Sequence, residues 1–345
     1  MCTPGNPDNQ ATRCSAGEHP IALAVEPSGR FLYVANWGAH SISAFRIESL
    51  TGTLSPVTGS PFPAGQWPHS VAIDPSGKLL YTANGQSNDV SAFRIEPSTG
   101  TLTAVRDAPF PANNHPEHVA VSPSGDFAYV CNGFSHDISA YKINRETGAL
   151  IQLPGAPFAT GEKPLAIAIN PSGSFAYVAN RRFDVWAYRI MCASGALEPI
   201  EGSPFPAGRG PTAITVEPSG RFVYVANFRS DNIGAYRIEH DSGALQQLDG
   251  SPFACGSIPI GLATDPSGSF LFVTNGNSND VSAYQIEPVS GALAPVEGSP
   301  FPAGQMPCGI GMEPSGSFVY VANWESNDIS AYRLERPSGV LTAIG

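Results

Sequence analysis

The chain has 345 residues, of which 36 are glycine and 33 are proline. Because these residues destabilise a helix interior by ~1 and ~3 kcal/mol respectively, a mainly helical protein is excluded. A hydrophobic fraction of 42% with 14% charged residues excludes a disordered chain. A net charge of −11 without a basic cluster argues against nucleic acid as a partner, and no apolar run reaches the ~18 residues of a membrane span.

The start of the chain is polar, and Met1–Gln10 contains no secretory signal. The sequence leaves two compartments open: the cytoplasm, or export with the leader removed. Residues 1–15 are treated as an N-terminal segment. The six cysteines form no Cys-x-x-Cys pair, so a structural zinc site is not expected. No Gly-rich phosphate loop and no His-Glu-x-x-His motif occur, and we expect neither a metal nor a cofactor.

An internal repeat covers the chain from residue 16 onward. The tripeptide Pro-Ser-Gly recurs seven times, with spacings of 48, 48, 48, 47, 48 and 48 residues. An Asn, an Ala-aromatic pair and a later Gly recur in step with it. A period of this length indicates one structural unit per copy. The seven tripeptides begin at Pro27, Pro75, Pro123, Pro171, Pro218, Pro266 and Pro314.

Each copy contains four β-like runs separated by turn residues. In the second copy these runs are His69–Asp74, Leu79–Ala83, Val90–Ile95 and Thr101–Val105. They are rich in β-branched and aromatic residues, and turn sequences such as Asp-Pro-Ser-Gly lie between them. Four strands in a unit of 40 to 50 residues are typical of a propeller blade. The sequence therefore predicts an all-β fold: a single seven-bladed β-propeller domain over residues 16–345.

One segment of the repeat is incomplete, which bears on how the ring closes. Ser-Pro-Phe, or Ala-Pro-Phe, occurs six times but is missing before the first copy. Two closures remain open: a plain abutment of the first and seventh blades, or an N-terminal strand that completes the seventh. The six segments begin at Ser60, Ala108, Ala156, Ser203, Ser251 and Ser299.

The repeat resembles that of a known family. Tyr-Val-Ala-Asn occurs at Tyr33, Tyr177, Tyr224 and Tyr320, together with Pro-Ser-Gly-x-Phe-x-Tyr-Val and Ser-x-Ala-Tyr-x-Ile patterns. These motifs are similar to the YVTN-type repeat of the lactonase family of seven-bladed propellers, which includes 6-phosphogluconolactonase and fungal carboxymuconate-lactonizing enzymes. The resemblance implies a small-molecule lactone as substrate, with His and Arg residues at one face of the ring in acid–base and anion-binding roles.

Features shared by all copies are interpreted as structural. The repeated Asn is expected to hydrogen-bond its own turn, and the acids before Pro-Ser-Gly, such as Glu26 and Asp74, to cap theirs. Alternation along the first run of each copy places branched residues between blades and small residues toward the channel. His118 is the exception among those small residues, so we expect it to point into the channel mouth. The equivalent residues are Ala22, Ser70, Ala166, Ala213, Gly261 and Gly309.

Departures from the repeat gather in the loops at this mouth. The third copy begins with His115-Pro116-Glu117-His118, where the resemblance would place a His at Glu117. The fourth copy is one residue shorter after its Asn and reads Arg181-Arg182 there. A His can activate water, and a guanidinium suits a carboxylate or phosphate. We predict His118 as a general base oriented by Glu117 and His115. The predicted substrate-binding residues are Arg181, Arg182, Arg209, His69, Ser70 and Trp67.

Two functions remain open. The first is a metal-independent lactone hydrolase, or lactonizing isomerase, acting on a sugar-acid or similar anionic lactone at the channel mouth over blades 3–5. The alternative is a non-catalytic binding or surface propeller with a protein partner, favoured by the near-uniformity of the copies. An enzyme should concentrate polar groups in one concave pocket, whereas a scaffold should present a flat face. Whether Cys255 and Cys308, on consecutive loops, are bonded is also left open.

Overall fold

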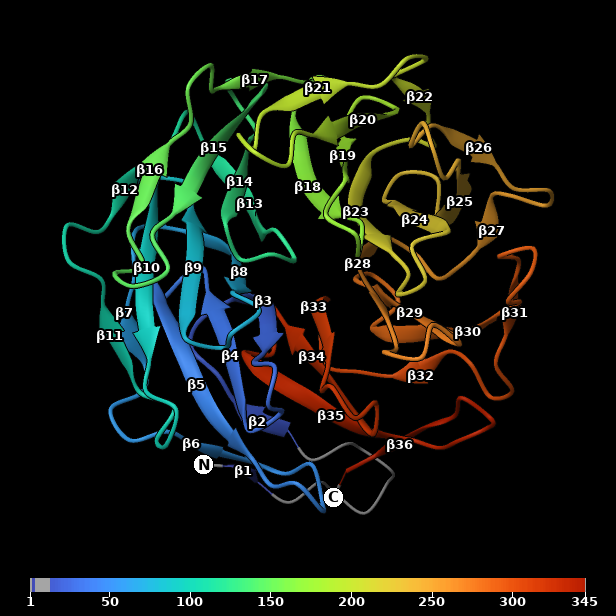
Figure 1. The fold of residues 1–345 in the computed structure, drawn as a ribbon. Coiled ribbons are helices and arrows are strands. Elements are labelled where there is room, and N and C mark those ends of the chain that lie inside the picture. Colours follow the sequence, from blue (N-terminus) through green and yellow to red (C-terminus); the bar gives the residue numbers. More distant parts are fainter. Residues whose placement is uncertain (1, 4–12, 345) are drawn as a thin grey trace.

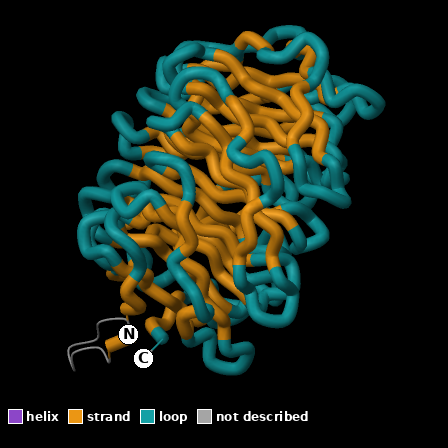
Figure 2. The backbone as a smooth tube through the Cα atoms, turned by 90° about the vertical axis from the view of Figure 1, so that its left-hand side faces the viewer, coloured by secondary structure: helices purple, strands orange, loops and turns teal. Residues whose placement is uncertain are grey.

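A computed structural model describes residues 2–3 and 13–344, which form a ring of seven antiparallel sheets and contain no α-helix. Figure 1 shows the ring along its axis, and Figure 2 shows that the strands run through the body while the loops lie at its surface. The predicted seven-bladed β-propeller is confirmed. In the part of the chain that the structure describes, no helix is long and apolar enough to cross a membrane.

Each blade begins at the channel with an inner strand, and we number blades 1 to 7 by these strands. A second strand pairs with each inner strand. The inner strands are β3 (Pro20–Val25), β8 (Pro68–Ile73), β13 (Pro116–Val121), β18 (Pro164–Ile169), β23 (Pro211–Val216), β28 (Pro259–Thr264) and β33 (Pro307–Met312). The second strands are β4 (Phe31–Asn36), β9 (Leu79–Asn84), β14 (Phe127–Asn132), β19 (Phe175–Asn180), β24 (Phe222–Asn227), β29 (Phe270–Asn275) and β34 (Phe318–Asn323).

The third strand of each blade carries the outer edge, which is divided into two short segments that both pair with it. The third strands are β5 (Ser41–Ile47), β10 (Asp89–Ile95), β15 (Asp137–Ile143), β20 (Asp184–Ile190), β25 (Asn232–Ile238), β30 (Asp280–Ile286) and β35 (Asp328–Leu334). The first outer segments are β6 (Leu54–Pro56), β11 (Leu102–Ala104), β16 (Leu150–Gln152), β21 (Leu197–Pro199), β26 (Leu245–Gln247), β31 (Leu293–Pro295) and β36 (Leu341–Ala343). The second segments, from the Ser/Ala-Pro-Phe motif, are β7 (Phe62–Pro63), β12 (Phe110–Pro111), β17 (Phe158–Ala159), β22 (Phe205–Pro206), β27 (Phe253–Ala254) and β32 (Phe301–Pro302).

The ring is closed by the N-terminal part of the chain. Strand β2 (Arg13–Ser15) pairs antiparallel with β35 and places Cys14 opposite Ile329. In blade 1, Phe62 of β7 occupies the same position opposite Ile42. Strand β1 (Cys2–Thr3) adds outside β2. Of the two closures that the sequence left open, the structure therefore has the second, and Figure 1 shows β2 next to β35.

Repeated contacts join neighbouring blades. The hydroxyl of Tyr33 in blade 1 donates to the carbonyl of Gly100 in blade 2 at 2.9 Å. Gly100 has φ +77°, and a Cβ there would lie 2.3 Å from the Phe31 ring, so only glycine fits. The same bond closes the ring, from Tyr320 in blade 7 to Gly52 in blade 1 at 2.8 Å. The shared tyrosines and glycines of the sequence are thus blade-to-blade contacts.

The shared polar residues have the structural roles expected of them. Glu26 accepts the backbone N–H groups of Ser28 and Arg30, both at 2.8 Å, within the Pro-Ser-Gly turn. The buried Asn36 donates from Nδ2 to the hydroxyls of Ser41 and Ser43 at the start of the third strand. These contacts satisfy the turn N–H groups and the Asn Nδ2 groups. The Oδ1 atom, in contrast, is buried without a hydrogen-bond partner among the described residues in Asn84, Asn132, Asn227 and Asn275.

Candidate active site

A pocket of about 540 Å³ opens where the seven inner strands begin, at one end of the channel. Each inner strand starts with a Pro that is preceded by a residue in the left-handed region, for example Trp67 (φ 56°) and His115 (φ 61°). A register shift follows the Pro, as between Pro116 and His118. This bulge turns the residue after the Pro into the pocket, and the seven residues at that position are Ile21, His69, Glu117, Leu165, Thr212, Ile260 and Cys308.

Glu117 is held between two histidines from neighbouring blades. Its carboxylate lies 3.4 Å from Nδ1 of His69 and 3.1 Å from Nδ1 of His115. The latter contact is short but is not an aligned hydrogen bond. The exposed fraction is 12% for the Glu117 side chain and 15% for each histidine. Gly85 makes room for this cluster, because a Cβ there would lie 2.8 Å from Nε2 of His69.

An indole fixes the orientation of His69. Trp37 Nε1, an obligate donor, lies 3.3 Å from Nε2 of His69. That nitrogen must therefore accept, so the ring proton sits on Nδ1 and faces Glu117. Burial lowers the pKa of His69, and the charge of Glu117 offsets this only in part. His69 is accordingly neutral at pH 7.

Opposing effects act on the Glu117 carboxyl. Burial alone would raise its pKa, but the contact with His115 and the charges of His69, His115 and Lys163 outweigh burial. The net result is a pKa below the usual range for a glutamate. Glu117 is therefore an ionised carboxylate in a mostly buried setting, an arrangement common where a side chain takes part in chemistry.

His118 lines the pocket, as expected, but its environment differs from the expected one. Burial lowers its pKa to about 4, and its Nδ1 is buried without a hydrogen-bond partner. Glu117 contacts His69 and His115, so the expected orientation of His118 by Glu117 is replaced by these contacts. A neutral imidazole with so low a pKa is a weak base at pH 7.

Blade 4 supplies two cations, Lys163 before the inner strand and Arg181 after the second strand. Both line the pocket, and the backbone N–H of Arg181 donates to the Lys163 carbonyl at 3.0 Å. The shortened turn that follows places Phe183 at φ 71°, where the other blades have a polar residue. Among the described residues, Arg181 forms no ion pair.

Two of the predicted arginines lie away from the pocket. Arg182 is exposed and pairs with Glu162 at 2.6 Å, and Arg209 is exposed and does not line the cavity. His69, Ser70, His115, Glu117, His118 and Arg181 do line it. The polar groups therefore come from blades 2–4 rather than blades 3–5. Lys163 was not predicted as a site residue from the sequence. The segment before the inner strand of blade 4 has the same length as in the other blades, and a lysine in a loop is usually solvated.

Stacked aromatic rings flank the polar groups along the rim. Trp67 stacks on Trp37 with centroids 4.8 Å apart, and Trp324 lies 5.0 Å from Trp37 on the other side. Phe134, 52% exposed, packs against His115 at 4.2 Å and lies 5.0 Å below the Lys163 ammonium. Trp67 itself does not line the pocket. Instead, the rings restrict the motion of Trp37, His115 and Lys163.

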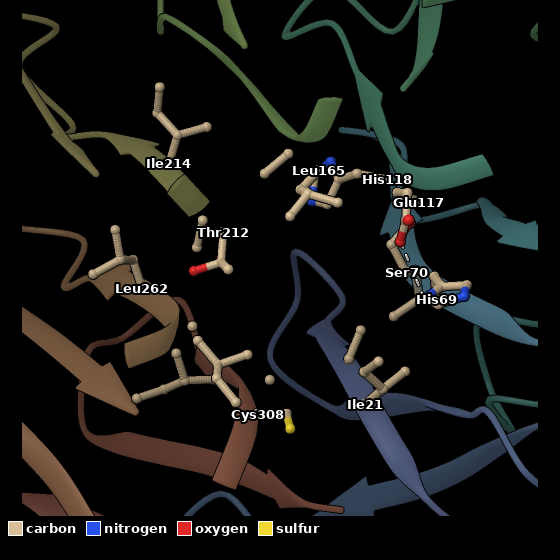
Figure 3. Close-up of a pocket in the computed structure, with 18 of the residues that line it drawn as sticks. Ile21, His69, Ser70, Glu117, His118, Leu165, Thr212, Ile214, Leu262 and Cys308 are labelled. Atoms are coloured by element: carbon tan, nitrogen blue, oxygen red, sulfur yellow. Dashed lines mark ion pairs between the residues drawn. The ribbon is translucent and has the colours of Figure 1, made fainter. Parts of the chain in front are cut away.

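The lining of the cavity has two parts with different chemistry, and Figure 3 shows His69 and Glu117 on the side opposite Ile214 and Leu262. We call His69, His115, Glu117, Lys163 and Arg181, from blades 2–4, the polar wall. We call Ile21, Ile214, Ile260, Leu262 and Ile310, from blades 5, 6, 7 and 1, the apolar wall.

Cys308 lines the pocket beside the apolar wall. It and Cys255 are both free thiols, so they are not bonded to each other. Burial raises the pKa of Cys308 to about 12, and this thiol is therefore protonated at pH 7 and unsuited to nucleophilic attack.

The polar wall also contains the side chains that could ligate a metal ion. One ligand atom each from His69, His115 and Glu117 lie within 4.8 Å of one another. Two histidines and a carboxylate are a ligand set for zinc or iron. The Trp37 N–H, however, places the His69 proton on Nδ1, the atom that faces Glu117. With a proton on that nitrogen, His69 fits a carboxylate–imidazole contact with Glu117 better than ligation of a metal through Nδ1.

Fold and pocket together define a seven-bladed β-propeller with a ligand-sized cavity at the end of its channel. The family described as Lactonase, 7-bladed beta-propeller matches residues 6–115, 102–258, 198–308 and 261–345. The chain belongs to this family, and its expected resemblance is confirmed. No curated protein sequence matches the chain significantly.

Solved structures share the fold at low sequence identity. A periplasmic gluconolactonase from Pseudomonas aeruginosa is 19% identical, with a TM-score of 0.75 over 94% of this chain and 96% of the other. A Bacteroides uniformis protein provisionally assigned as a 6-phosphogluconolactonase gives 19% identity, a TM-score of 0.75 and 94% coverage of both chains. Hydrazine synthase from Kuenenia stuttgartiensis is 18% identical, with a TM-score of 0.70 over 95% and 99%. Because different chemistries share this fold, the argument for function must come from the site.

Proposed function

We propose that the protein hydrolyses a small anionic lactone in this pocket. The observation that carries the proposal is the Glu117 carboxylate held between His69 and His115, beside the cations of blade 4. Membership of the lactonase family supports a lactone as the substrate class. The concave pocket and the lowered pKa values of His69 and Glu117 favour an enzyme over a flat binding scaffold.

Lys163 and Arg181 hold the negative group of the substrate. Their backbones are joined by a hydrogen bond, and both side chains line the cavity. A guanidinium offers paired donors that match a carboxylate or phosphate, and the ammonium adds a second charge. The lactone ring then lies over the polar wall, within reach of His115 and Glu117.

His115 acts as the general base. Glu117 holds the Nδ1 side of its ring, which leaves Nε2 to accept a proton, as in other carboxylate–imidazole pairs. The oxygen of a water molecule attacks the lactone carbonyl carbon while one water proton passes to Nε2. The tetrahedral intermediate then breaks its ring C–O bond, and the departing alkoxide takes that proton. The product is an open-chain hydroxy acid, and the reverse sequence closes a lactone.

The other histidines of the pocket have supporting roles. His69 is a positioning residue: Trp37 fixes its tautomer, and its Nδ1–H faces Glu117. His118 contributes a neutral imidazole to the pocket and does not carry the proton. This assignment moves the base from His118 to His115, while Glu117 keeps the orienting role expected of it.

The test is hydrolysis of a panel of sugar-acid, dicarboxylic and alkyl lactones by the wild type, His115→Ala and His240→Ala. His240 is a matched control because its side chain is fully exposed and pairs only with Asp241. We expect kcat/KM to fall by about 10²-fold or more in His115→Ala and to be unchanged in His240→Ala. A folded wild type that binds these anions without opening any lactone would favour the non-catalytic binding propeller instead.

A further inference from the structure

The apolar wall differs from the polar wall in what it offers a bound molecule. Ile21, Ile260 and Leu262 reach the cavity, and the glycines at positions 261 and 309 add no side-chain donor or acceptor. All ionisable nitrogen and oxygen side chains that line the pocket belong to blades 2–4. A substrate bound at the polar wall therefore turns its far side toward hydrocarbon.

The few polar side chains near the apolar wall are already engaged. The single hydroxyl proton of Thr212 is shared between the carbonyls of Pro259 at 3.0 Å and Ala226 at 3.3 Å, so this group is not free to donate to a ligand. The thiol of Cys308 donates to the Met306 carbonyl at 3.4 Å. A substrate hydroxyl turned toward this side would lose its bonds to water and find no free side-chain donor among these lining residues, with Oγ1 of Thr212 as the one side-chain oxygen that could accept from it.

We propose that the substrate is an anionic lactone whose far side is hydrocarbon, an alkyl- or aryl-substituted ring rather than a polyhydroxylated sugar lactone. This inference rests on the proposed function, because it takes the polar wall as the place where the lactone and the anion bind. A cavity of about 540 Å³ accommodates a lactone ring together with a hydrocarbon substituent. An apolar pocket discriminates against an added hydroxyl by roughly 10- to 100-fold, which sets the expected selectivity.

The experiment compares two δ-lactones that both carry a carboxylate, one with an alkyl substituent and one with ring hydroxyls. For the wild type we expect kcat/KM to be at least about tenfold higher for the alkyl compound. In Ile260→Asn this ratio should fall about tenfold, because the new amide offers partners to hydroxyls. Ile260→Val, which keeps the surface apolar, is the control and should leave the ratio within about twofold. Equal rates, or faster opening of the hydroxylated lactone by the wild type, would overturn the inference without any variant.

A binding measurement separates this inference from the proposed function. Calorimetry with the two matching open-chain acids shows whether the pocket binds the alkyl or the hydroxylated compound more tightly. This measurement does not require the protein to hydrolyse a lactone. Tighter binding of the alkyl acid by about tenfold, with no hydrolysis of either lactone, would support the inference about the walls and contradict the proposed function. Hydrolysis accompanied by tighter binding of the hydroxylated acid would support the proposed function and contradict the inference about the walls.

Discussion

The polar wall and the apolar wall are built on the same backbone. In both, a residue with positive φ precedes a Pro, a register shift follows, and the next side chain enters the pocket. Blades 2 and 3 place His69 and Glu117 at that position, whereas blades 6 and 1 place Ile260 and Ile21 there. The other members of the polar wall lie just before the Pro or just after the second strand, and they are His115, Lys163 and Arg181. The difference between the walls therefore depends on substitutions at a few repeat positions, while the scaffold that presents them is unchanged.

The largest effect is expected from Glu117→Gln, which removes the charge that distinguishes the two walls. The amide keeps the shape of the side chain but cannot stabilise a protonated His115. We expect kcat/KM for lactone hydrolysis to fall by about 10²- to 10³-fold. Steady-state kinetics with circular dichroism as a folding control would measure this. Activity within threefold of the wild type would show that Glu117 is only structural.

Loss of a cation from the polar wall should weaken substrate binding. Arg181→Ala removes a guanidinium that lines the pocket, and we expect KM to rise by about tenfold with a smaller change in kcat. Arg106→Ala removes the same charge from a side chain that is 95% exposed, so it should leave KM unchanged. If both variants behaved alike, the net charge of the protein rather than the site would explain the effect.

His118→Ala is expected to change how the free energy of unfolding depends on pH. Alanine fits this position, because blades 1, 4 and 5 have Ala there. Burial lowers the pKa of His118 to about 4, while an unfolded histidine titrates near 6.5. Between these values the unfolded chain binds more protons, so the wild type loses stability as pH falls from about 6.5 to about 4.

The expected loss is up to about 3 kcal/mol, and His118→Ala should not show it. Urea unfolding at pH 7 and at pH 4.5 gives, for each protein, the change in the free energy of unfolding between the two pH values. The effect of the substitution on packing is the same at both pH values, so it cancels in this change. The same dependence on pH in both proteins would mean that His118 is not desolvated.

A smaller effect is expected from Trp37→Phe. The phenyl ring preserves the stacking on Trp67 but removes the N–H that fixes the tautomer of His69. One neutral hydrogen bond contributes about 1 kcal/mol, so we expect kcat to fall by about fivefold with an altered pH profile. Trp324→Phe keeps that N–H and is the control. Identical pH profiles for wild type and Trp37→Phe would remove Trp37 from the site.

The fold could be predicted from the sequence because seven copies of one unit specify seven blades and their strands. The departures from that unit, His115-Pro-Glu-His118 and the shortened turn at Arg181, also identified four of the residues that line the pocket: His115, Glu117, His118 and Arg181. The pairing of Glu117 could not be predicted. Alternation places residues 117 and 118 on opposite faces, but the register shift after Pro116 brings both to the pocket. A bulge of one residue leaves no mark on the hydrophobic pattern.

The sequence left two ring closures open without deciding between them, and it gave no sign of the contact of Trp37 with His69. Strand β2 carries no Ser-Pro-Phe motif, so only its pairing with β35 identifies it as the missing segment. Trp37 and His69 lie 32 residues apart in different blades, and their contact depends on the packing of two loops. Both features are tertiary: the first arises where the chain ends meet in blade 7, and the second from the packing of blade 1 against blade 2.

The central claim is that the polar wall opens a lactone whose negative group is held by blade 4. It is tested most directly by following ring opening of a carboxylated alkyl δ-lactone by the wild-type protein at pH 7, with proton release as the readout. The account predicts saturable turnover that is inhibited competitively by the matching open-chain acid. Tight binding of that acid with no ring opening above the uncatalysed rate would contradict it.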